Sequence, residues 1–257
     1  MKSRYQWNVD MILRILTTVL LLLCIGHAGA EDLRWQLGLE TGGVWQSRND
    51  VQIPNDTGTR YSLVDTVGSG PFPFYRLELS YRFNPRHSLR LLYAPFEYTK
   101  SGRFDNDVKF VDQTFDANTD TEATYRFNSY RATYRYWFQN QTKWRWSVGF
   151  TANIRDAEIA LSQQGKSASD SNVGFVPLLN FYGEYLFANR WRFIVDFDGL
   201  AGPQGRAVDL GLMARYDVAE SWYIGGGYRT LEGGADNDEV YNFAWFHFAS
   251  LSAGYRF

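Results

Sequence analysis

The feature that most constrains this chain is a two-residue alternation that runs to its last residue. Counting back from Phe257, every second residue is apolar as far as Ala249, and the residues between, such as Arg256 and Ser252, are polar, charged or small. This is the period of a β-strand, whose side chains point alternately to its two faces. Such a strand left as an exposed edge in water would aggregate. We therefore expect it to pair with the first strand and close a barrel.

The same alternation recurs along the chain and predicts ten strands, at residues 33–46, 72–83, 88–101, 123–138, 144–159, 173–187, 190–201, 206–217, 221–232 and 241–257. Pro95 interrupts the third segment, which predicts a bulge or an end there. In the fifth segment the apolar phase changes at Ile159 and Leu161, which predicts a bulge near residues 155–156. The predicted fold class is an all-β, transmembrane, antiparallel up-and-down β-barrel of ten strands. Eight strands is the alternative, if the third or sixth segment is misassigned.

The connections between these segments alternate in length. Those after the second, fourth, sixth and eighth segments are short, whereas long polar connections are predicted at about 47–71, 102–122 and 160–172. Trp144, Trp191 and Trp222 each begin a segment after a short turn, as in an interfacial aromatic girdle. The polar phase carries charges on nearly every segment. A membrane barrel with a charged interior is favoured over a soluble barrel, whose interior would be apolar.

The first 30 residues are predicted to be a cleaved signal peptide, and residues 31–257 the barrel. A basic stretch and a short apolar run precede Ala28 and Ala30, the small residues of the expected cleavage site. Cys24 follows Leu23, where lipid attachment would need a small residue, so an ordinary signal is favoured. No apolar run of spanning length follows residue 30, which argues against helical membrane spans. The absence of basic clusters argues against nucleic-acid binding.

The terminal strand, with Tyr255 and Phe257 in alternation, resembles the last strand of Gram-negative outer-membrane β-barrels. The resemblance implies a location in the outer membrane, with membrane lipid and lipopolysaccharide as neighbours. It also implies that Tyr255 and Phe257 form the signal read by the barrel-insertion machinery. It implies neither a cofactor nor an oligomeric state.

Charged residues of the polar phase are predicted to face the lumen, and they include both signs in similar numbers. Two interpretations stay open: a salt-bridged plug that stiffens the barrel, and a narrow water-filled conduit for ions or small solutes. Acidic residues in the long loops could bind divalent cations, but they lack the spacing of a calcium-binding loop, so no metal site is predicted. The predicted lumen charges are Glu40, Arg76, Glu78, Arg82, Arg131, Arg135, Arg145, Glu184, Arg192, Asp196, Asp198, Asp209, Arg215 and Arg229.

Candidate catalytic residues are few. By its phase, His247 faces lipid at the outer aromatic belt, and Ser250, three residues on, should face the other way. Asp196 and Asp198 distantly resemble the paired acids of ten-stranded outer-membrane proteases, but that class also has an Asp-x-His pair, and here Trp245 precedes His247 by two residues. The favoured function is a non-enzymatic structural or surface-binding protein or narrow passive pore. The alternative is a lipid or peptide hydrolase with a rim site near His247, Asp196 and Asp198.

Overall fold

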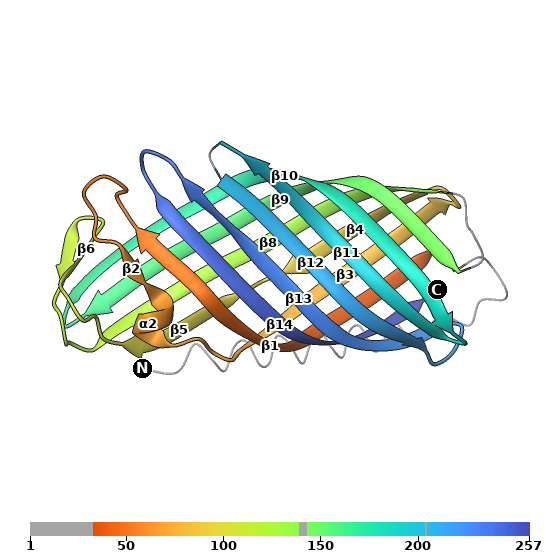
Figure 1. Ribbon diagram of the computed structural model, residues 1–257, viewed down its shortest axis with the longest axis horizontal. Helices are drawn as coiled ribbons and strands as arrows, with labels where there is room; N and C mark the ends of the chain where they lie inside the picture. Colours follow the sequence, from red (N-terminus) through yellow and green to blue (C-terminus); the bar gives the residue numbers. More distant parts are fainter. Residues whose placement is uncertain (1–32, 139–142, 204) are drawn as a thin grey trace. The chain divides into compact units, whose positions relative to one another are not determined.

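A computed structural model describes residues 33–138, 143–203 and 205–257; the predicted signal peptide and its cleavage site lie outside these ranges. Residues Arg34–Arg256 form one body, a closed antiparallel β-barrel (Figure 1). Of the described residues, ten segments make the wall, as predicted: β1 (Trp35–Gln52), β3 (Phe72–Asn84), β4 (His87–Ala94) continued by β5 (Glu97–Gly102), β8 (Thr121–Trp137), β9 (Trp144–Gln163), β10 (Lys166–Ala188), β11 (Trp191–Gly202), β12 (Gly205–Asp217), β13 (Trp222–Asp236) and β14 (Tyr241–Arg256).

The barrel closes where the alternation predicted it would, by pairing of β14 with β1. Their register begins with Gln36 opposite Arg256 and ends with Gln52 opposite Tyr241. The third wall segment is interrupted at Pro95 and Phe96, and its two parts, β4 and β5, both pair with β8. Proline has no amide hydrogen for the ladder, which accounts for the break. No described helix has both the length and the apolar character needed to cross a membrane.

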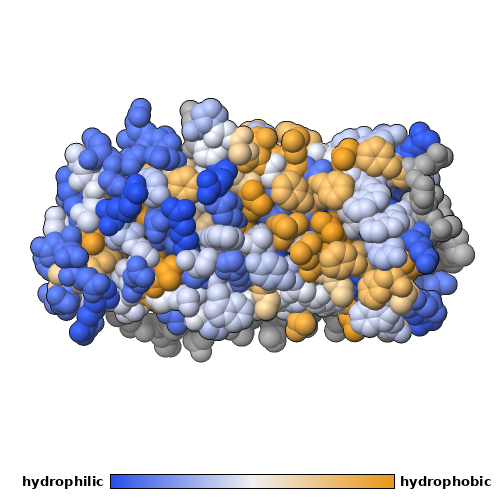
Figure 2. Space-filling model, in the orientation of Figure 1, coloured by the Kyte–Doolittle hydropathy of each residue, from blue (hydrophilic) through white to orange (hydrophobic). Residues whose placement is uncertain are grey.

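Apolar side chains cover the outside of the wall, and polar ones line much of the inside. Leu251 is 68% exposed, whereas its inward neighbour Ser250 is 4% exposed. Val148, Phe150 and Leu179 are likewise exposed on their strands. Figure 2 shows apolar residues gathered in a band across one face, with hydrophilic residues beyond it towards β6 and α2. Trp144, Trp191 and Trp222 lie beside short turns, and we call this the short-turn end.

Two predictions about the fifth and sixth segments are wrong. Residues 160–172 are not a loop, because β9 and β10 continue as a hairpin whose turn is Gln164 and Gly165, both at positive φ. There is no bulge at residues 155–156, and the ladder stays in register there. Ile159 and Leu161 are apolar and yet face inward, since the lumen lining changes from polar to apolar along the axis.

The opposite, long-loop end is filled by an apolar core inside the barrel. The loops after β1 and β5 fold over it through β2 (Tyr61–Ser62), α2 (Leu63–Val67), β6 (Val108–Phe110) and β7 (Gln113–Phe115). In the loop between β5 and β8, Arg103 Nε donates to Asp120 at 2.7 Å, and this hydrogen bond lowers the pKa of that carboxyl. We call the core the outer plug; its buried members include Val44, Leu63, Phe72, Phe74, Phe96, Tyr98, Phe110, Phe115, Tyr125, Leu161, Phe246 and Phe248.

Candidate functional site

The middle of the lumen is crossed by an ion-pair network that joins seven wall strands. The period of two turns these side chains inward from β1, β3, β4, β8, β11, β12 and β13. All are largely removed from solvent, and five arginines face four carboxylates. We call this set the central network: Glu40, Arg76, Arg90, Arg131, Arg135, Asp196, Asp198, Asp209 and Arg229.

Arg90 is the most enclosed member, with 1% of its side chain exposed. Its Nη1 lies 2.7 Å from Asp196 Oδ2, and its Nη2 lies 2.8 Å from Asp198 Oδ2. Arg135 Nη2 holds the other oxygen of Asp196 at 2.8 Å. Asp198 Oδ1 accepts hydrogen bonds from Thr151 at 2.6 Å and from Asn180 at 2.9 Å. Each carboxylate therefore has its charge compensated and both oxygens hydrogen-bonded.

Asp209 links the other half of the network. Its Oδ2 lies 2.7 Å from Arg131 Nη1 and 3.2 Å from Arg76 Nη1, and its Oδ1 lies 2.6 Å from Arg229 Nη1. Arg229 Nε also donates to Glu40 at 3.1 Å. Since Arg131 contacts both Asp198 and Asp209, the two halves form one connected structure across the bore.

A second cluster lies nearer the short-turn end. Glu184 Oε1 lies 3.3 Å from Arg215 Nη2, and its Oε2 lies within 3.8 Å of Arg145 and Arg192. Asp217 accepts from Arg192 at 3.0 Å and from Arg256 at 2.7 Å. We call these residues the lower cluster.

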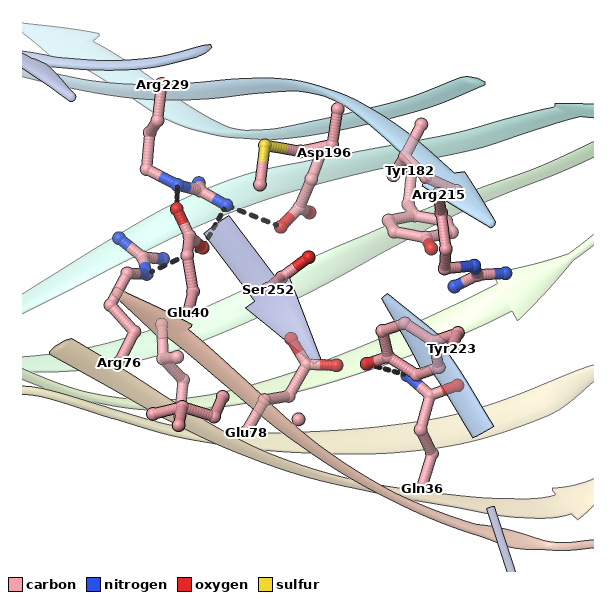
Figure 3. A pocket seen from close by; sticks show the side chains of 15 residues that line it. Gln36, Glu40, Arg76, Glu78, Tyr182, Asp196, Arg215, Tyr223, Arg229 and Ser252 are labelled. Carbon is pink, nitrogen blue, oxygen red and sulfur yellow. Dashed lines mark hydrogen bonds and ion pairs between the residues drawn. The ribbon is translucent and has the colours of Figure 1, made fainter. Parts of the chain in front are cut away.

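A cavity of about 90 Å³ lies between the central network and the lower cluster. Figure 3 shows Glu40, Arg76, Arg229 and Asp196 along one side and Tyr182, Arg215, Tyr223 and Gln36 along the other. Glu78 points into it, accepts a hydrogen bond from Ser80 at 3.0 Å and keeps 29% of its side chain exposed. The space suits a few water molecules rather than a lipid or a peptide.

All fourteen predicted lumen charges face inward, twelve of them in two groups. Eight belong to the central network, and Glu184, Arg145, Arg192 and Arg215 belong to the lower cluster. Glu78 lines the cavity, and Arg82 lies over the Trp137 ring at 5.4 Å. The sequence reasoning missed Arg90, although it alternates with Leu89 and Leu91, because Leu91-Leu92 and Pro95 blurred the phase of that strand.

The predicted rim residues are not brought together. His247 lies on the outer face of the wall between inward-facing Phe246 and Phe248, whereas Asp196 and Asp198 are inside. Ser250 also points inward and donates to Glu40 at 2.8 Å. His247 instead meets Ser47, with Oγ to Nε2 at 2.8 Å, and Tyr228, with the hydroxyl to Nδ1 at 2.6 Å. Neither partner was predicted: Ser47 stands 200 positions from His247, and Tyr228 stands 19 positions from it on the neighbouring strand β13.

Within the described residues, no group of three or more His, Cys, Asp or Glu side chains is arranged to hold a metal ion. The acidic side chains of the lumen are held by arginines instead.

No known family profile matches the chain, and no curated protein matches it. Solved structures do. The outer membrane protease OmpT of Escherichia coli is similar at a TM-score of 0.50 and 10% identity, over 87% of this chain and 97% of that one. Ail, the attachment invasion locus protein of Yersinia pestis, is similar at a TM-score of 0.40 and 13% identity, over 87% of this chain and 99% of that one. Neisserial surface protein A is similar at a TM-score of 0.37 and 13% identity, over 87% of this chain and 97% of that one.

The closed antiparallel wall, the apolar outer belt and the ionic lumen define the class of the protein. It is a ten-stranded β-barrel with the fold of Gram-negative outer-membrane proteins, and it resides in the outer membrane. In barrels of this class the short turns face the periplasm and the long loops face outward. We therefore expect the short-turn end, where β1 begins and β14 ends, to be the periplasmic side.

Proposed function

We propose that the protein is a non-conducting barrel with a structural or surface-binding role, and that its lumen is a plug rather than a pore. The observation that carries this proposal is the pairing of Arg90 with Asp196 and Asp198 across the bore, at 1% exposure of the arginine side chain. An ion moving through would have to displace charges that are already paired. The outer plug adds a second barrier of apolar side chains above the network.

The outer surface is what remains available for contact with the surroundings. Leu63, Phe110 and Phe115 are side chains of the outer loops, and all three are fully buried, so these loops are folded onto the barrel rather than extended from it. A prefolded surface loses little conformational entropy when it binds, which suits a binding role. Membrane lipid and lipopolysaccharide are the proposed partners, with insertion proposed to depend on Tyr255 and Phe257.

The hydrolase built on Asp196 and Asp198 is not favoured. Both carboxylates are held by arginines inside the barrel and have no route to His247 through the wall.

Planar-bilayer recording tests the plug. The purified barrel should give no steady current after insertion, whereas a 16-stranded porin inserted under the same conditions should conduct. Insertion is verified separately by the shift in gel mobility of the folded, unheated barrel. Stepwise currents that scale with the amount of inserted protein would show that the lumen conducts and would refute the proposal.

A further inference from the structure

Three polar side chains form a hydrogen-bonded chain on the lipid-facing wall, in the order Ser47, His247, Tyr228. Ser47 Oγ lies 2.8 Å from His247 Nε2, and the Tyr228 hydroxyl lies 2.6 Å from Nδ1. They come from β1, β14 and β13, which are neighbours in the wall. A nucleophile within reach of a base, with the base oriented by a third group, is the arrangement used in nucleophilic catalysis.

A β-bulge aims Ser47 at the histidine. Gln46 pairs with Phe246 and Arg48 with Trp245, so Ser47 is an extra residue in β1. Gln46 and Asn49 are consequently both buried, although an uninterrupted strand would point them to opposite faces, and Asn49 donates to Gln46 at 3.1 Å. Bulges are frequent beside active sites, where they redirect a side chain.

The trio lies at the depth of the ester bonds of the outer leaflet. His247 is nine residues from Arg256 at the periplasmic end. At about 3.4 Å per residue and a strand tilt of about 40°, it stands about 23 Å above that end. The apolar band of such barrels is about 25 Å tall. Trp245, whose indole donates to Thr230 at 2.7 Å, lies beside it on the same face.

We propose that Ser47, His247 and Tyr228 form a hydrolytic site for ester-linked acyl chains of outer-leaflet lipids. Ser47 and His247 are the catalytic residues, and Tyr228 is a positioning residue that accepts a hydrogen bond from Nδ1 and leaves Nε2 free to act as the base. This goes beyond the proposed structural role and does not depend on whether the lumen conducts.

The reaction needs only water as co-reactant. Ser47 Oγ attacks the ester carbonyl carbon while its proton passes to His247 Nε2. The C–O bond to the lipid alcohol breaks, and that alkoxide takes the proton from Nε2, leaving an acyl-serine. Water then attacks the acyl carbonyl and gives a proton to Nε2. The bond to Ser47 Oγ breaks, the serine recovers the proton, and a fatty acid is released.

Guanidinium groups farther out on the same face indicate an anionic lipid. Arg48 Nη2 donates to the Tyr241 hydroxyl at 2.8 Å, and Arg48 and Arg206 lie 5.3 and 5.2 Å from the Phe243 ring. Both arginines also have a carboxylate partner, but a guanidinium has five N–H donors, so some remain to meet a phosphate. A phosphate and an acyl ester occur together in glycerophospholipids and in lipid A.

Labelling with a long-chain alkyl fluorophosphonate tests the nucleophile. The folded protein in detergent micelles should be modified at Ser47, located by peptide mass spectrometry. Ser47→Ala should abolish this labelling, and His247→Asn should slow it at least about 100-fold. Ser162→Ala removes another exposed serine, and His87→Asn removes a histidine that hydrogen-bonds Tyr134 at the other end of the wall. Both controls should label at the normal rate.

The role of Tyr228 is tested by the dependence of the labelling rate on reagent concentration. Tyr228→Phe removes only the hydroxyl, so His247 Nδ1 loses the partner that orients the ring. The maximal labelling rate should fall while the reagent concentration that gives half of that rate stays unchanged, a split that a purely structural role would not produce. Folding of each variant is verified by gel mobility without heating.

Fatty-acid release then separates the two lipid sources. The protein is mixed with vesicles of phosphatidylethanolamine and phosphatidylglycerol in one arm and with purified lipid A in the other. Release in either arm, lost in Ser47→Ala, supports the proposal and identifies the source. If the folded wild-type protein is neither labelled at Ser47 nor active in either arm, the proposal is wrong. The three side chains would then be only a polar cluster in the aromatic belt.

Discussion

At the scale of single residues, the lumen shows why burial of charge is tolerated here. Arg90, Asp196 and Asp198 would each lose hydration in the closed bore, and the cost is offset because each side chain has more than one partner. Asp198 accepts from Arg90, Arg131, Thr151 and Asn180. Its loss would therefore leave two arginines undercompensated at once.

Asp198→Asn should destabilise the barrel strongly. The amide keeps the shape of the side chain but removes the negative charge from a site lined by donors. We expect the free energy of unfolding to fall by about 3–5 kcal/mol, as when one partner of a buried pair is removed. Urea titration of the folded barrel in lipid vesicles, followed by tryptophan fluorescence, measures it. Asp105→Asn, on an exposed outer loop, should change it by less than about 0.5 kcal/mol. Equal stability of the two variants would contradict the role assigned to the network.

The inward direction of a side chain could be predicted wherever apolar and polar residues alternate without interruption, as around Arg131 and Asp209. Arg90 was missed because proline and adjacent leucines obscured the phase of its strand. Ser47 was missed for another reason: it stands 200 positions from His247, and only closure of the barrel brings β1 against β14. A contact that depends on closure and on a bulge leaves no local pattern in the chain.

At the scale of elements, the long β9–β10 hairpin depends on its two-residue turn. Gln164 has φ 44° and Gly165 has φ 85°, as in a turn with two left-handed residues. The polar composition of residues 160–172 predicted a loop because strands that extend beyond the membrane carry polar side chains on their outer face. The continuation of β9 and β10 beyond the membrane was therefore not predicted, because the composition of these residues is typical of loops.

Gly165→Ala should weaken this hairpin. A Cβ at Gly165 would meet no atom within 4 Å, so the cost comes only from placing a non-glycine residue at positive φ. We expect a loss of about 1 kcal/mol in the free energy of unfolding. Gly202→Ala is the matched control, because that position is equally open and has no positive φ. The same urea titration compares them, and equal losses in both variants would point to a general effect of removing glycine.

At the scale of the whole molecule, the lumen is layered along its axis. The lower cluster lies nearest the short-turn end, the central network comes next, and the outer plug fills the far end. Ten strands and a charged interior could be predicted from alternation alone. The apolar filling of the outer half could not be predicted. In the sequence, an inward apolar residue such as Leu161 shows the same change of alternation as a lipid-facing residue that follows a bulge.

Site-directed labelling can verify which end of this layered lumen faces the outside of the cell. Cys24, the sole cysteine of the sequence, lies in the predicted signal peptide, so an introduced cysteine would be the only thiol in the mature protein. Asn106→Cys places it on the outer loops and Ala219→Cys in the short turn between β12 and β13; both positions are exposed. In intact cells a membrane-impermeant maleimide should label the first and not the second, because short turns face the periplasm. Permeabilising the outer membrane should make both react, which controls for thiol accessibility. The reverse pattern would put the outer plug on the periplasmic side and remove the Ser47–His247 pair from the outer leaflet.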